Sequence, residues 1–139
     1  MGALGILVFA LGIAASVALH EAGHMFAARA FGMRVRRYFI GFGPRVWSTT
    51  RGGTEYGVAA LPLGGFCEIA GMTAMDEVTP EEAPHAMVNK PAWQRIGVMA
   101  GGIAMNLLIG VMLIYVVAVF SGIPNPDADR TPRVGELSC

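Results

Sequence analysis

The fold is decided by the stretch GALGILVFALGIAASVALHEAGH, residues 2–24, in which no charged residue precedes Glu21. About 20 consecutive apolar residues are enough for a helix to cross the hydrocarbon core of a bilayer. A second uncharged run lies between Arg95 and Asp127. We therefore expect a membrane protein that is mainly α, with transmembrane helices at about Ala3 to Ala28 and Ile96 to Phe120.

The first run ends in an H-E-x-x-H motif, His20-Glu21-Ala22-Gly23-His24. Residues four apart lie on one face of a helix, so both imidazoles can reach one metal ion. Glu21 then lies beside the water that the metal activates, as a candidate general base. Ionisable residues inside a membrane span are functional candidates by default because burying them in lipid is costly. The motif predicts a zinc hydrolase embedded in the membrane.

The amino-acid composition narrows the classes of protein to which the chain could belong. The chain has 139 residues, 54% of them apolar and 14% charged, with zero net charge. This predicts one domain whose partner is the lipid bilayer, with no nucleic acid. Cys67 and Cys139 have no metal-ligand spacing.

A cleaved signal peptide fits poorly because no Lys or Arg precedes the apolar run. A soluble protease with two core helices fits poorly because the runs are too long.

The basic residues predict the orientation. Most of them lie between the two spans, and only Arg130 and Arg133 lie outside. By the positive-inside rule the connecting region is cytoplasmic and both chain ends face outward. With Arg29 at the interface, a rise of about 1.5 Å per residue places His24 roughly 7 Å and His20 roughly 13 Å below the surface. We expect a multi-pass membrane protein with its active site near the cytoplasmic face.

Between the spans the pattern changes from helical to extended. Short segments rich in β-branched and aromatic residues predict strands at Val35–Ile40, Val46–Thr50, Thr54–Ala60 and Phe66–Ala70. Arg51-Gly52-Gly53 is a plausible hairpin turn. Pro62 and Gly64-Gly65 are expected to interrupt the extended chain between the third and fourth strands and to leave an exposed strand edge. The region is either a surface hairpin or an apolar loop at residues 59–66 that dips toward the membrane and offers its edge to an extended substrate.

An acidic segment follows Gly71. Thr79-Pro80-Glu81-Glu82 has the form of a capping box and predicts the start of a short helix. The carboxylates of this segment suit a solvated face better than a metal site. His85 has no partner at ligand spacing and is expected to be an exposed histidine. A role for His85, Asp76 or Glu77 as a third metal ligand stays open.

Asn106 is the one strongly polar side chain in the middle of the second span. Gly102 and Asn106 lie four apart on one helix face, as do Asn106 and Gly110. The amide either joins the two spans by an interhelical hydrogen bond or, beside a metal site, holds a substrate carbonyl or an oxyanion.

The ordered motifs of the chain resemble the site-2 protease family of intramembrane zinc metalloproteases, in particular its bacterial RseP-type members. The resemblance runs from about His20 to Gly110 and covers the N-terminal half of that family's pattern. Its motifs are H-E-x-x-H, Phe31-Gly32, Ile40-Gly41-Phe42-Gly43-Pro44, Gly53-Thr54-Glu55-Tyr56, Leu61-Pro62-Leu63-Gly64-Gly65-Phe66, Lys90-Pro91-Ala92-Trp93-Gln94-Arg95 and Gly102-x-x-x-Asn106.

The resemblance implies a role for each matched position. His20 and His24 would ligate Zn2+, and Glu21 would activate water. The β-region between the spans would be membrane-associated and would pair with an unwound substrate helix. The substrates would be single-span membrane proteins such as anti-sigma factors, cleaved in regulated intramembrane proteolysis. The substrate-binding residues would be Asn106, Gly102, Leu61, Pro62, Leu63, Gly64, Gly65 and Phe66.

The family takes its third zinc ligand from a later span, which we expect downstream of Cys139. Catalytic zinc needs three protein ligands and a water. The chain is therefore expected to be a catalytically incomplete part, with a PDZ-like region beginning at its end. Its organisation would be a first span with the motif, a β-region, an acidic linker with a short helix, a second span and an outward segment, at residues 1–28, 29–71, 72–95, 96–120 and 121–139. The alternative function is a membrane metal-ion carrier that uses the histidine pair.

Overall fold

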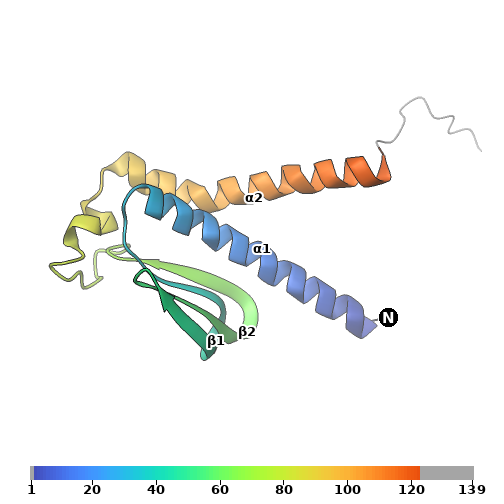
Figure 1. The fold of residues 1–139 in the computed structure, drawn as a ribbon, viewed down its shortest axis with the longest axis horizontal. Helices are drawn as coiled ribbons and strands as arrows, with labels where there is room; N and C mark the ends of the chain where they lie inside the picture. Colours follow the sequence, from blue (N-terminus) through green and yellow to red (C-terminus); the bar gives the residue numbers. More distant parts are fainter. Residues whose placement is uncertain (1, 123–139) are drawn as a thin grey trace, which may run out of the picture.

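The computed structural model describes residues 2–122 of the chain. Two long helices cross near one end and diverge toward the other, and a small sheet folds back against the first helix (Figure 1). Short turns close the end where the helices cross. The elements in chain order are α1 (Gly2–Ala30), β1 (Val35–Arg51), β2 (Thr54–Ile69), η1 (Ala83–His85), η2 (Met87–Asn89) and α2 (Ala92–Ser121).

Both helices are long and apolar enough to cross a membrane, as the sequence predicts. Their mean hydropathy reaches 2.4 in α1 and 2.6 in α2. At about 1.5 Å per residue each is roughly 45 Å long, which exceeds a hydrocarbon core of about 30 Å. Only 6% of the most apolar window of α1 and none of that of α2 is buried. Core helices of a soluble protein would be mostly buried, so this exposure disfavours the soluble alternative.

The sheet consists of two long strands where the sequence predicted four short ones. β1 and β2 pair antiparallel across the turn at Gly52 and Gly53, both of which have positive φ, so the predicted hairpin turn is confirmed. β1 bends at Gly41, where φ is 92° and a Cβ would lie 2.7 Å from the Leu61 carbonyl oxygen. The predicted interruption at Pro62 and the following glycines is wrong: β2 continues through them, because these residues bend the strand without ending it.

The bends fold the hairpin back on itself. Arg37–Ile40 of β1 pairs with two segments of β2, Glu68–Gly65 and Glu55–Val58. As the residue numbers along β1 rise, those of the partners fall in the first segment and rise in the second. Four strand segments therefore lie side by side in the order 65–69, 35–40, 55–59 and 45–51. The first of these has no strand partner on its outer edge within residues 2–122. The folded hairpin lies along α1, beside the motif (Figure 1).

The predicted short helix after Thr79 is reduced to a turn. The Glu82 amide donates to the Thr79 hydroxyl at 3.3 Å, so the predicted cap is formed. Only the 3-10 turns η1 and η2 follow, because Pro84 lacks the amide hydrogen that would continue a helix. The Glu82 carboxylate accepts hydrogen bonds from Arg36 and leaves the capping box open.

A small core lies where the helices, the sheet and the turns meet. It fixes the end of α1 against the start of α2 and against the outer strand segment, and thereby positions the motif. Its buried residues are Met25, Ala28, Met33, Val35, Cys67, Ile69, Met87 and Val98. The remainder of the predicted outward segment, from residue 123 to Cys139, lies outside the described residues.

Candidate metal centre

The two motif histidines point to one place, as the helical spacing predicts. His20 Nε2 lies 3.2 Å from His24 Nε2. Two nitrogen ligands at about 2.0–2.1 Å from a tetrahedral zinc are about 3.4 Å apart. Ligand atoms of His20, Glu21 and His24 all lie within 4.8 Å of one another, and no other such group is found within residues 2–122. The donor set and its spacing fit a zinc ion.

The backbone of α2 determines the tautomer of His24. His24 Nδ1 lies 2.7 Å from the carbonyl oxygen of Val98. A carbonyl oxygen can only accept, so Nδ1 carries the hydrogen and Nε2 keeps its lone pair for a metal. Such a partner on the second ring nitrogen orients a metal-ligating histidine. The sequence does not reveal this role of Val98, because a backbone carbonyl leaves no signal in residue type.

His20 is held by a side chain of α2. Asn106 Nδ2 lies 3.1 Å from His20 Nδ1. In this arrangement the amide donates to Nδ1, and a hydrogen on His20 Nε2 bridges to His24. The Asn106 amide also carries an oxygen, which can accept a hydrogen bond from a protonated His20 Nδ1. In that tautomer the lone pair of His20 Nε2 is free for a metal. The structure thus brings Asn106 into contact with one of the two motif histidines, His20.

Gly102 provides the space for the imidazoles. A Cβ at this position would lie 2.6 Å from His24 Nε2 and 2.7 Å from His20 Nε2. Any other residue would overlap the metal-binding nitrogens. Gly102 was expected to bind substrate, and the observed contacts are with the two histidines.

The sheet reaches the centre at Gly65. A Cβ at Gly65 would lie 3.6 Å from Glu21 Cγ and 3.5 Å from Val17 Cγ1, so strand β2 passes beside the candidate base. Leu61 and Leu63 are exposed, with 53% and 73% of their surface accessible, and Pro62 is also exposed. These residues belong to β2 and are not the loop that the sequence suggested.

Aromatic stacking stiffens the same strand. Phe66 stacks on Phe39 with a centroid distance of 5.4 Å, and Phe42 stacks on Phe66 at 6.4 Å. Gly64 is buried under the Phe42 ring, since a Cβ there would lie 2.2 Å from Phe42 Cε2. The segment of predicted substrate-binding residues therefore has a defined shape.

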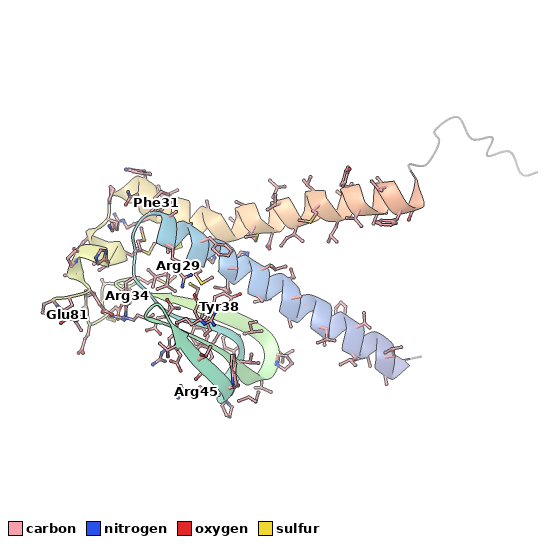
Figure 2. All side chains as sticks on the ribbon, in the orientation of Figure 1. Arg29, Phe31, Arg34, Tyr38, Arg45 and Glu81 are labelled. Carbon is pink, nitrogen blue, oxygen red and sulfur yellow. The ribbon has the colours of Figure 1, made fainter. Side chains whose placement is uncertain are left out.

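Tyr38 is a further residue that positions the site. Its hydroxyl donates to the Ala18 carbonyl of α1 at 2.5 Å, two residues before His20. Burial raises the pKa of Tyr38, so the hydroxyl keeps its proton and remains a donor. Figure 2 shows Tyr38 between the sheet and α1. Burial also raises the pKa of the neighbouring Cys67 thiol to about 12, which makes Cys67 an inert core residue.

None of the other candidate ligands joins the centre. Asp76 accepts from Arg36 Nη1 at 2.8 Å and from the Gly71 amide at 2.6 Å. Hydrogen bonds from Arg36 lower the pKa of Asp76 and also that of Glu82. His85 is exposed, as expected, and its Nδ1 donates to the Gly32 carbonyl oxygen at 2.9 Å. Within the described residues, a third ligand from His85, Asp76 or Glu77 is not found.

Comparison with known proteins identifies the family. The model for peptidase family M50 matches residues 8–136. The chain belongs to peptidase family M50. The resemblance to site-2 proteases noted in the sequence is thereby confirmed. This M50 chain is 55% identical over 143 residues to the zinc metalloprotease Rip1 of Mycolicibacterium smegmatis, covering all of this chain and 35% of that protein.

Two further similar proteins are also named as proteases. Rip1 of Mycobacterium tuberculosis H37Rv is 54% identical over 97% of this chain and 33% of its own length. The regulator of sigma-E protease RseP of Salmonella typhimurium 14028s is 37% identical over 97% of this chain and 28% of its own length. The chain spans about a third of the length of the curated relatives it matches.

Proposed function

We propose that this chain carries the metal-binding part of a zinc-dependent intramembrane endopeptidase. The observation that carries the proposal is the 3.2 Å approach of two imidazole nitrogens within an apolar helix, beside Glu21. His20 and His24 would hold zinc. When bound, zinc polarises a carbonyl and makes water a nucleophile near neutral pH. The names of the zinc metalloprotease relatives support this choice of metal.

Glu21 would be the general base. Its carboxylate would accept a proton from the attacking water and deliver that proton to the departing amide nitrogen. Asn106 would bind the substrate carbonyl with the amide that contacts His20. A metal-ion carrier would need a series of ligand groups along its path. Residues 2–122 contain one such group, which favours the peptidase.

The substrate would be an extended segment of a single-span membrane protein. The outer edge of Gly65–Ile69 is free of strand partners in the described part of the chain, and Gly65 lies beside Glu21. A peptide that adds to such an edge satisfies its backbone hydrogen bonds, which a segment leaving its own helix needs in a membrane. Leu61, Pro62, Leu63, Gly64, Gly65 and Phe66 would line this path. An anti-sigma factor is a suitable substrate class, in agreement with the sigma-E regulator among the relatives.

The decisive experiment replaces the base. Glu21→Gln in the whole protein should reduce cleavage of a membrane substrate at least a hundredfold, as expected for loss of a general base, while zinc content is retained. Glu81→Gln is the matched control, because Glu81 is exposed on the acidic segment far from the motif (Figure 2). Cleavage close to that of the unchanged protein would remove Glu21 from the mechanism.

The orientation is tested by labelling. We propose a bacterial inner membrane protein with the sheet and turns on the cytoplasmic side. Met75 is 96% exposed, so Met75→Cys should react with a membrane-impermeant thiol reagent only from the cytoplasmic side. The buried Cys67 should stay unreactive, and Cys139, outside the described residues, should react from the outer side. The opposite accessibility would reverse the topology.

A further inference from the structure

A cavity lined by basic side chains lies where α1 ends, away from the metal centre. It has a volume of about 290 Å³ and includes backbone from the α1–β1 link and from the hairpin turn. Arg29, Arg34 and His85 line it, and no carboxylate is among its lining residues. The Lys90 ammonium lies at its rim, 3.8 Å from where a Cβ on Gly32 would be. The cavity therefore brings together nitrogen-bearing side chains from two segments of the chain, residues 29–34 and 85–90.

Arg34 differs from Arg36, Arg37 and Arg45 in its charged partners. Arg36, Arg37 and Arg45 all form ion pairs with carboxylates, whereas no such pair is found for Arg34 within residues 2–122. The nearby Glu82 is held by Arg36 through both carboxylate oxygens. The Arg34 guanidinium rests against Gly53, where a Cβ would lie only 2.6 Å from Arg34 Nη1. Among the described residues none accepts a hydrogen bond from its five N–H donors, which can therefore bind an anion.

The placement of Arg34 does not depend on its side chain. The Arg34 amide donates to the His85 carbonyl at 2.9 Å, and its carbonyl accepts from the Ala70 amide at 2.9 Å. The backbone is thus anchored on both sides, while the side chain is exposed. A substitution of the side chain should remove the charge and keep the fold.

Arg29 faces the same cavity with neutral partners only. Its Nη2 donates to the Thr54 hydroxyl at 3.2 Å and to the Tyr56 hydroxyl, and its guanidinium lies 5.6 Å from the Tyr56 ring centroid. Figure 2 shows Arg29 at the end of α1 above the sheet and Arg34 near the beginning of β1. Neither guanidinium group has a carboxylate ion-pair partner within residues 2–122.

The cavity is placed where lipid headgroups would be. It lies at the last turn of an apolar helix long enough to span, where the proposed orientation puts the cytoplasmic interface. The exposed Trp93 packs edge-on against Phe31 at 5.4 Å, close to the same end of α1, and tryptophan is enriched at membrane interfaces. We propose that this basic cavity binds the phosphate of an anionic phospholipid headgroup. Arginine binds phosphate by paired, charge-assisted hydrogen bonds, and basic pockets on the cytoplasmic side of membrane proteins suit anionic headgroups.

Lipid titration of the whole protein in detergent tests the proposal. Phosphatidylglycerol should raise the unfolding temperature, because a ligand that binds the folded state stabilises it, and phosphatidylcholine should raise it much less. Arg34→Gln should weaken the apparent affinity for phosphatidylglycerol about tenfold, the loss expected for one charge-assisted contact. Arg34→Lys should weaken it less, because a charge remains without the paired donors.

Arg95→Gln is the matched control. Arg95 is another exposed arginine close to the helix crossing, and it does not line this cavity. Its substitution should leave the affinity unchanged, and zinc content should be unchanged in all three variants. Equal stabilisation by the two lipids, unchanged binding in Arg34→Gln, or an equal loss in Arg95→Gln would overturn the proposal. So would inorganic phosphate that reproduces the full Arg34-dependent shift, since the ligand would then be a soluble anion.

Discussion

Glycines at the helix crossing and glycines on the diverging arms of α1 and α2 have opposite surroundings. At the crossing, a Cβ on Gly23 would lie 2.3 Å from the Gly101 carbonyl oxygen, and one on Gly101 would lie 2.6 Å from the Gly23 carbonyl oxygen. On the arms, a Cβ on Gly12 or on Gly110 would meet nothing within 4 Å. The same residue type is a requirement of close packing in one region and unconstrained in the other.

The difference explains how an apolar helix pair holds a polar site. Small residues let membrane helices approach until their backbones touch. Here that approach brings the Val98 carbonyl to His24 and leaves room at Gly102 for both imidazoles. The arms are exposed apolar surface suited to lipid, and they contribute nothing to the metal centre.

Among the substitutions that compare the crossing with the arms, the largest expected effect comes from Gly102→Ala. The added methyl overlaps both Nε2 positions, so zinc affinity should fall about ten- to hundredfold, the range seen when the groups around metal ligands are disturbed. Gly110→Ala, two turns further along α2, should leave it unchanged. Zinc affinity is measured by competition with a chelator on the whole protein. Equal affinities for the two variants would show that the crossing is looser than described.

Gly23→Ala should separate the helices. The new methyl would meet Gly101 backbone atoms at 2.3 and 2.8 Å, which a side-chain rotation cannot relieve. We expect a loss of about 1–3 kcal/mol in the free energy of unfolding, as for overpacked interiors. Gly12→Ala should be neutral or slightly stabilising. Denaturant titration in detergent compares the pair, and an unaffected Gly23→Ala protein would contradict the tight crossing.

Asn106 lies between the two regions, one turn beyond Gly102. In the whole protein, Asn106→Ala should reduce cleavage while zinc affinity falls less than in Gly102→Ala. The loss of an interhelical hydrogen bond should cost only about 0.6 kcal/mol of stability, which is the average for such bonds in membranes. Parallel assays of cleavage, zinc content and unfolding separate the roles. Cleavage that stays at the level of the unchanged protein would rule out the proposed substrate contact.

The smallest effect concerns the ion pairs of Arg36 with Asp76 and Glu82, which depend on charge, whereas the helix crossing depends on close packing. Hydrogen bonds from Arg36 lower the pKa of Asp76 and of Glu82. A carboxyl group whose pKa is lower in the folded state stabilises the fold at pH values above its ordinary pKa of about 4. This stabilisation is lost as the pH falls through the folded-state pKa. Arg36→Gln should therefore lower the unfolding temperature slightly at pH 7, and the gap should close below about pH 4.

The effect of Gly23→Ala should be the same at both pH values, because that contact contains no titrating group. A gap for Arg36→Gln that persists unchanged into acid would show that Arg36 acts through packing of its chain rather than through its ion pairs.

Much of the site could be predicted from residue spacing alone. His20, Glu21 and His24 are four residues apart at most, so helix geometry by itself brings their side chains together. The helix bounds also followed from the uncharged runs, to within four residues at each end. The strands were harder, because Gly and Pro bend β2 at positions where they usually end a strand. The short helix failed because Pro84 and the Arg36 contact outweighed the local capping signal.

The sequence by itself determined the two apolar helices, the histidine pair and the hairpin turn at Gly52 and Gly53, since each depends on interactions between residues close in the chain. Only the tertiary structure decided that Val98 orients His24, that Gly102 clears space for both rings, and that Gly65 lies beside Glu21. These contacts join residues 44 to 82 positions apart, as counted from Gly65 to Glu21 and from Gly102 to His20. Their physical basis is close backbone approach, which residue type permits but does not specify.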